Sequence, residues 1–271
     1  MTRLFGLKIF AVMASSLLAG SFAMNVYANN SWGGYHWGRT SSSLTLKLGD
    51  NVSSAWDAHL EGVSYDWTLS SALDTAIVQG AGARKSRCPW TNGRVEVCNY
   101  TYGSNGWLGI AQIYISGSHI TKGQVKLNDS YFNKAAYNTS AWRKMVMCQE
   151  VGHTLGLAHQ DEIFDNPNLG TCMDYTNNPA RDDGFGNNQN PNAHDYDQLV
   201  SIYAHLDSVN TAASTSAKNG SRSFGVIQDT TFEGPSSWGK SLKQDDRGKS
   251  SLYERNLGGG EKLLTFVIWA E

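Results

Sequence analysis

The sequence has no excess of positive charge. It contains 22 Lys and Arg residues against 24 Asp and Glu residues, which gives a formal net charge of -2. Proteins that hold nucleic acid through its phosphates depend on a basic surface. The charge balance therefore argues against nucleic acid as a partner.

Long apolar runs are also missing, except at the start of the chain. Basic residues flank an acid-free apolar stretch over residues 9–23, and small residues follow it, which is the layout of a secretory signal peptide. Cleavage after Ala28 is expected, with Ala23 as a second candidate. A membrane anchor is the alternative, although the stretch is shorter than the ~20 residues of a spanning helix. We interpret residues 1–28 as a signal peptide and the mature chain as secreted, extracellular or periplasmic, and free of the membrane.

The four cysteines form no CxxC pair, which disfavours a zinc site held by cysteines, the alternative use of these side chains. In an exported chain they indicate two disulfides, for which three pairings exist. Cys88 and Cys98 flank a segment that contains Asn92-Gly93, a strong signal for a tight turn. We therefore expect the pairs Cys88–Cys98 and Cys148–Cys172.

Hydrophobic periodicity predicts an α+β fold without internal repeats. The expected strands cover residues 44–48, 94–102, 108–115 and 124–128, and the expected helices cover residues 67–79, 140–155 and 193–203. Residues 177–192 are crowded with Asn, Asp, Gly and Pro and are expected to form an irregular loop. A catalytic domain is predicted over residues 29–207, a linker over 208–223 and a small β extension over 224–271.

The segment from Gln149 to His159 carries the pattern with the clearest chemistry. Gln149 and His153 lie four residues apart, so a helix places them on one face, with Glu150 next to the first. Gly156 permits the left-handed turn that ends a helix, which returns the chain so that His159 can supply a third ligand. Three protein ligands and an open position are typical of catalytic zinc, and Glu150 is then the candidate general base toward the bound water.

These residues resemble the metzincin metallopeptidases, whose signature HExxHxxGxxH is matched at Glu150, His153, Gly156 and His159. The resemblance implies a twisted mixed sheet, an active-site helix and a C-terminal helix, and it implies zinc as the cofactor. It also implies a methionine turn at Met173, with Tyr175 assisting the metal or the oxyanion. By the same resemblance, residues 108–115 correspond to the substrate-side edge strand of the family.

The chain departs from the signature at Gln149, where the family has its first histidine. An amide oxygen can coordinate a cation, but it is neutral and a poorer zinc donor than imidazole. Gln149 is therefore a provisional ligand. Recruitment of another side chain or water is one alternative, and an inactive site that only binds is the other.

Other polar groups have weaker signals. The loop acids and amides offer oxygens that suit Ca²⁺, but without EF-hand spacing. Gln160, Asp161 and Glu162 follow the third ligand and are candidates to orient it by hydrogen bonds. The remaining histidines show no ligand-like spacing and are interpreted as structural or surface residues; they are His36, His59, His119, His194 and His205.

Together these features predict a secreted zinc-dependent endopeptidase that hydrolyses a polypeptide substrate. The alternative is a secreted binding protein that kept the metzincin shape and lost turnover.

Overall fold

The computed structural model describes residues 30–82, 86–212 and 234–270. The predicted signal peptide and most of the predicted linker lie outside these residues. Within the described part of the chain, no helix is both long and apolar enough to cross a bilayer.

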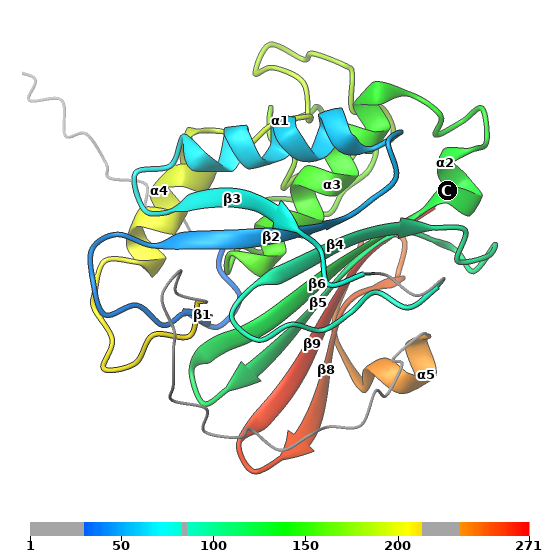
Figure 1. Cartoon of the computed structure of the whole chain (residues 1–271). Coiled ribbons are helices and arrows are strands. Elements are labelled where there is room, and N and C mark those ends of the chain that lie inside the picture. Colours follow the sequence, from blue (N-terminus) through cyan, green and yellow to red (C-terminus); the bar gives the residue numbers. More distant parts are fainter. Residues whose placement is uncertain (1–29, 83–85, 213–233, 271) are drawn as a thin grey trace, which may run out of the picture.

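One mixed sheet organises the molecule (Figure 1). Its order is β3-β2-β4-β6-β5-β9-β8-β7, and the short β1 pairs with β6 in addition. The strands of one half, β1, β2, β3, β4 and β6, run parallel, whereas β5, β7, β8 and β9 join by antiparallel pairing. Their bounds are β1 His36–Trp37, β2 Thr45–Asn51, β3 Asp74–Gln79, β4 Val95–Tyr100, β5 Trp107–Ser116, β6 His119–Asn128, β7 Lys240–Gln244, β8 Ser250–Gly258 and β9 Glu261–Trp269.

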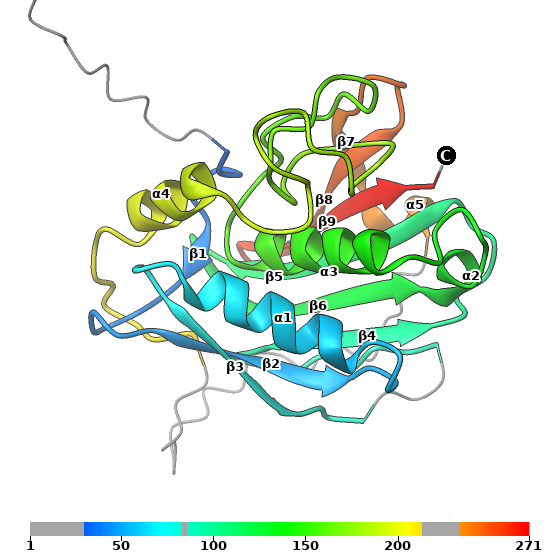
Figure 2. The same ribbon diagram turned by 90° about the horizontal axis from the view of Figure 1, so that it is seen from above.

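Helices cover the two faces of the sheet unequally. Figures 1 and 2 show α1 and α3 side by side on one face, with α4 at the end of this layer and the short α5 on the opposite face. The main core lies beneath α1 and α3, and a smaller cluster packs Trp238 of α5 against β5 and β9. The helices are α1 Asp57–Thr68, α2 Asp129–Phe132, α3 Ser140–Thr154, α4 Ala193–Ile202 and α5 Pro235–Trp238.

Capping residues determine where α3 and α4, the two helices nearest the site, begin. The Thr139 hydroxyl accepts a hydrogen bond from the Trp142 backbone N–H at the start of α3. At α4, Asn192 and Asp195 form a capping box. Both helices begin within two residues of the predicted positions because these short polar side chains satisfy free N–H groups of the first turn.

The helix predicted over residues 67–79 is wrong. Helix α1 ends at Thr68, and residues 74–79 form strand β3, which pairs in parallel with β2. The true apolar face of α1 lies earlier, at Leu60, Val63 and Trp67. The run containing Ile77 and Val78 fits both the helical and the strand periodicity. Pairing with β2 selects the strand, since tertiary context overrides weak local preference.

The position of β5 also differs from expectation. Residues 108–115 were expected at the edge of the sheet, but β5 lies between β6 and β9. Strand β9 pairs with β5 over its whole length, from Trp107↔Trp269 to Ser116↔Glu261. The C-terminal strands exist as predicted, yet they enlarge the main sheet instead of forming a separate appendage.

Candidate metal centre

Helix α3 delivers the predicted site residues into the interior. It is buried along its last two turns and ends at the C-cap Leu155. Gly156 follows with φ +109°, and a Cβ there would lie 2.8 Å from the Tyr35 carbonyl oxygen. The predicted chain reversal at Gly156 is confirmed, because only glycine adopts this backbone conformation without strain in so close a contact.

The structure brings His153 and His159 together. Their Nε2 atoms lie 2.9 Å apart. Each Nδ1 atom faces an acceptor: the Leu157 carbonyl oxygen at 2.8 Å from His153, and the Glu162 carboxylate at 2.5 Å from His159. Each Nδ1 atom is therefore engaged by an oxygen acceptor, and the two Nε2 atoms point toward each other.

This convergence fits a bound cation. Tetrahedral zinc with nitrogen ligands at 2.0–2.1 Å separates neighbouring ligand atoms by roughly 3.3 Å, close to the observed spacing. Burial and the neighbouring His159 hold the pKa of His153 well below its ordinary value. The ring is neutral as a result, which is the form that binds metal.

Gln149 lies one turn before His153 and is fully buried. Its amide nitrogen donates to the Cys172 carbonyl oxygen at 2.8 Å. Its Oε1 atom is buried and has no hydrogen-bond partner in the described structure. An unsatisfied buried acceptor costs free energy, and an amide oxygen in this state is able to coordinate a cation.

Glu150 is the buried acid of the site. Its side chain is completely shielded, and this burial raises the pKa of its carboxyl well above the ordinary value. Gly109 of β5 makes the close approach possible, since a Cβ there would lie 2.9 Å from the Glu150 Cγ. Burial thus favours the neutral form of this acid.

Met173 and Tyr175 line the site from below and beside it. A Cβ on Gly152 would lie 2.6 Å from the Met173 sulfur, which places this methionine directly against α3. The Tyr175 ring centroid lies 4.5 Å from that of His159. The turn predicted at Met173 is thus beneath the helix that carries His153.

A disulfide and the ionic contacts of Glu162 stabilise this arrangement. The structure contains both predicted disulfides, Cys88–Cys98 and Cys148–Cys172, and the second joins α3 to the segment before Met173. Of the three polar residues that follow His159, Glu162 is the one that forms a hydrogen bond with its ring. Lys243 forms an ion pair with the same carboxylate, and His159 and Lys243 lower the pKa of Glu162 to about 2 against the opposing effect of burial.

Strand β9 covers the site. The Phe266 ring stacks on His153 with ring centroids 4.0 Å apart and an interplanar angle of 14°. The Tyr175 hydroxyl donates to the Val267 carbonyl oxygen at 2.9 Å, and the Ser251 hydroxyl of β8 donates to Glu162. Sequence reasoning missed these contacts, because nothing in the local pattern of residues 250–270 signals a partner 89 or more positions earlier.

The remaining candidates fall into two groups. In the loop over residues 177–192, Asp182 accepts a hydrogen bond from a backbone N–H of the loop itself, whereas Asp183 and Asn188 accept from the backbone N–H groups of Asn168 and Gly170. Calcium there stays a prediction. His36, His119 and His205, interpreted from the sequence as structural or surface residues, place their Nε2 atoms around Asp207. The signal was hidden, because these residues lie on three distant segments.

Comparison with known proteins gives a weak similarity. No family model matches the chain, and no curated protein sequence matches it. The solved structure of myroilysin resembles it with a TM-score of 0.36 and 13% identity, over 65% of this chain and 99% of that chain. High choriolytic enzyme 1, a hatching enzyme zinc-protease from Oryzias latipes (medaka fish), gives 0.35 and 14%, over 65% and 98%. Similarity at this level carries no argument about the site or the activity of this chain.

Proposed function

We propose that this chain is a secreted zinc-dependent endopeptidase. The observation that supports it is the pair of buried imidazoles whose Nε2 atoms lie 2.9 Å apart, with Gln149, whose side-chain oxygen is unsatisfied, one helical turn before His153 and Glu150 next to Gln149. Two imidazoles alone occur in many cores. Two imidazoles with both Nδ1 atoms committed elsewhere, an orphan amide oxygen and a buried acid form a donor set suited to a catalytic metal.

The residues divide the work of peptide hydrolysis. His153, His159 and Gln149 would hold zinc, which supplies an activated water and polarises a carbonyl when bound. Glu150 would take a proton at its carboxylate and return it to the leaving amine. Tyr175 would place its hydroxyl near the reacting carbonyl, and Glu162 keeps His159 in the tautomer that binds metal.

Hydrolysis of an unfolded protein substrate by the purified chain tests the proposal. Zinc content is measured in parallel for the wild type, Glu150→Ala and Gln149→His. We expect zinc-dependent cleavage by the wild type and a loss of at least ~10²-fold in Glu150→Ala, with zinc retained, since a positioned general base contributes about that factor.

The competing function is a binding protein that keeps the shape without turnover. Gln149 favours it, because a weaker donor holds zinc less tightly. Cleavage by Gln149→His but never by the wild type would establish that alternative. Equal cleavage by the wild type and Glu150→Ala would remove Glu150 from the proposed chemistry.

A further inference from the structure

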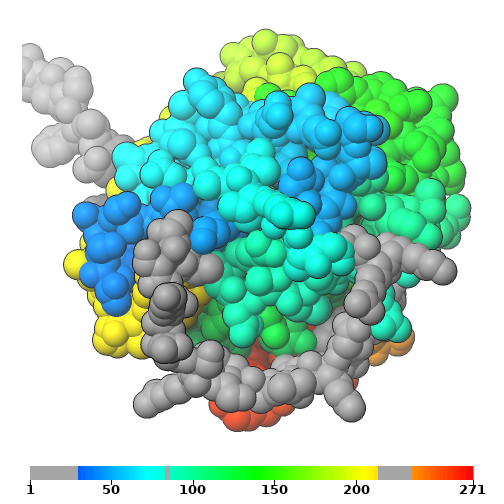
Figure 3. Space-filling view, in the orientation of Figure 1, coloured from blue at the N-terminus to red at the C-terminus, as the bar shows by residue number. Residues whose placement is uncertain are grey.

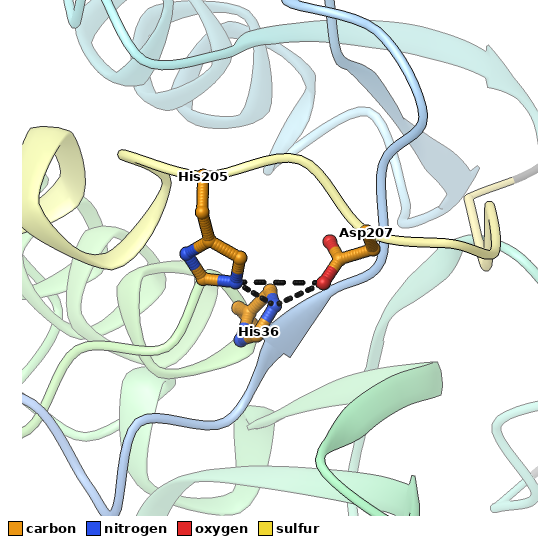
Figure 4. Close-up of side chains that lie close together, drawn as sticks. All are labelled: His36, His205 and Asp207. Atoms are coloured by element: carbon orange, nitrogen blue, oxygen red, sulfur yellow. Dashed lines mark hydrogen bonds and ion pairs between the residues drawn. The ribbon is translucent and has the colours of Figure 1, made fainter.

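The site at α3, formed by Gln149, Glu150, His153 and His159, is called the α3 site. Away from it, three histidines surround one carboxylate. Asp207 follows α4, and its Oδ1 atom lies 3.3 Å from His36 Nε2, 3.0 Å from His119 Nε2 and 3.4 Å from His205 Nε2. Figure 4 shows His36, from β1, pointing toward His205 and Asp207 of the segment after α4. Distant parts of the chain therefore meet in one cluster of metal-ligating side chains.

Three of these atoms have the spacing of a metal face. His36 Nε2, His205 Nε2 and Asp207 Oδ1 are 3.2, 3.3 and 3.4 Å apart in pairs. Ligands at 2.0–2.1 Å around a tetrahedral ion are separated by roughly 3.3 Å, so the three atoms match one triangular face of such a site. His119 contacts the same carboxylate oxygen but lies outside this triangle.

The surrounding hydrogen bonds orient these side chains. His36 Nδ1 lies 2.9 Å from the Gly34 carbonyl oxygen, a contact that turns Nε2 toward His205 and Asp207. The second oxygen of Asp207 accepts from the Arg39 backbone N–H at 2.9 Å. Such outer hydrogen bonds orient ligands toward a metal, and His119 can serve the carboxylate in the same way.

We propose that His36, His205 and Asp207 form a second metal site, which takes zinc or a similar borderline divalent ion. Imidazoles with one carboxylate suit zinc, and three ligands leave a fourth position for water. The His205 side chain is 54% exposed, so an ion can enter from solvent. Figure 3 shows the yellow segment after α4 beside the blue N-terminal segment at the surface. The bound ion would link these two segments.

Zinc stoichiometry tests the second site. Wild type, His205→Ala and the control His194→Ala are loaded with zinc, dialysed and measured by mass spectrometry of the metal, with circular dichroism to confirm folding. His205 is chosen because its exposed side chain can be removed with little harm to the core. We expect His205→Ala to hold one zinc fewer per chain than the wild type and His194→Ala to hold the same number.

Equal zinc content in His205→Ala and the wild type would overturn the site and leave an ion-paired His-Asp cluster without metal. The result does not depend on the α3 site, because His153 and His159 are unchanged in all three chains.

A separate observation concerns access to the α3 site. Strand β5 borders Glu150, and β9 pairs antiparallel with β5. Phe266 of β9 packs on His153. Peptides commonly bind proteins by adding a strand to a sheet edge, with main-chain pairing and side chains seated in pockets. Strand β9 has both features within the same chain.

We infer that the β8–β9 hairpin is an internal inhibitor that occupies the place of the peptide substrate, an inference that rests on the proposed function. Gln149, Glu150 and His153 are completely shielded, so neither water nor a substrate reaches them while β9 is paired. The Val267 carbonyl holds the Tyr175 hydroxyl, which is therefore not free for a substrate. Hydrolysis then requires the hairpin to leave β5.

A disulfide across β5 and β9 tests this inference. Gln112 and Thr265 are register partners on the sheet face opposite α3, and their side chains are 3.3 Å apart, so Gln112→Cys with Thr265→Cys locks β9 without touching the site. The matched control, Tyr253→Cys with Thr265→Cys, joins only β8 to β9. Phe266→Ala removes the ring from His153 and loosens the hairpin.

Cleavage of an unfolded substrate is expected to fall at least ~10-fold in the locked chain relative to the control, and to rise in Phe266→Ala. Equal rates in the locked and control chains, or no gain in Phe266→Ala, would overturn the inhibitor. Absence of cleavage by all these chains and by Gln149→His would instead contradict the proposed peptidase function.

Discussion

At position 149 an amide stands one turn before a buried imidazole, and its oxygen has no partner among the described residues. The neighbouring Cys172 carbonyl fixes the amide by accepting from its nitrogen. This orientation presents the oxygen, not the nitrogen, as the free group. A bound cation would satisfy this oxygen. Without a metal the buried oxygen stays unpaired, which costs free energy.

Replacement of Gln149 by histidine is predicted to tighten zinc binding by about tenfold or more, because imidazole is a better donor to zinc than an amide. Competition with a chromophoric chelator measures the affinity. Gln149→Leu is the control and should weaken binding, since it removes the donor while keeping a side chain of similar size. Equal affinities for all three chains would show that position 149 is not a ligand.

Gly109 determines how closely Glu150 approaches the sheet. A Cβ at this position would lie 2.5 Å from Val146 Cγ1, so Gly109→Ala forces α3 away from β5. We predict a loss of about 1–3 kcal/mol in the free energy of unfolding, the usual cost of overpacking. Denaturant unfolding measures it, and Gly62→Ala is the control because its nearest atom is 3.9 Å away. A stability equal to that of the wild type would show that the contact relaxes freely.

At the scale of elements, α3 is the scaffold of the site. Its start depends on the Thr139 cap, and its end depends on Gly156. Thr139→Ala is predicted to lower the free energy of unfolding by about 1 kcal/mol, because one N–H group of the first turn loses its acceptor. Ser140→Ala, one residue further on an exposed position, should change little in the same thermal or denaturant experiment.

The elements show which predictions local sequence supports. Helices α3 and α4 were predicted closely, because polar caps and helical apolar spacing agree at both. Strand β3 was mistaken for a helix, because a short apolar run fits two periods and its pairing partner β2 decides. The donor set of the α3 site followed from one local motif, whereas the His36 cluster needed three segments to meet.

At the scale of the whole molecule, buried carboxyl groups make stability depend on pH. Burial raises the pKa of Asp174 to about 7, although hydrogen bonds from the Leu169 backbone N–H and the Asn188 amide lower it. The folded chain thus holds a proton that the unfolded chain releases near pH 4. This contribution to stability is present below about pH 4 and is lost as the pH rises through 7.

Asp174→Asn should remove that dependence. Between pH 5 and pH 8 we predict that the wild type loses on the order of 2 kcal/mol more stability than the variant. Thermal unfolding at both pH values measures the difference, and the exposed Asp197→Asn is the control. Glu162, with its lowered pKa of about 2, acts only below about pH 4.5 and does not disturb this window. An equal change in stability between pH 5 and pH 8 in Asp174→Asn and the wild type would contradict the prediction.

The sequence by itself determined what depends on neighbours along the chain. The spacing of Gln149, Glu150, His153 and His159 follows from helical geometry and one glycine, and the turn at Asn92-Gly93 accompanies the Cys88–Cys98 pair. Only the tertiary structure decided that β9 pairs with β5 and that His36, His205 and Asp207 meet. Long-range pairing is selected by burial over the whole sheet, a free energy that no short segment encodes.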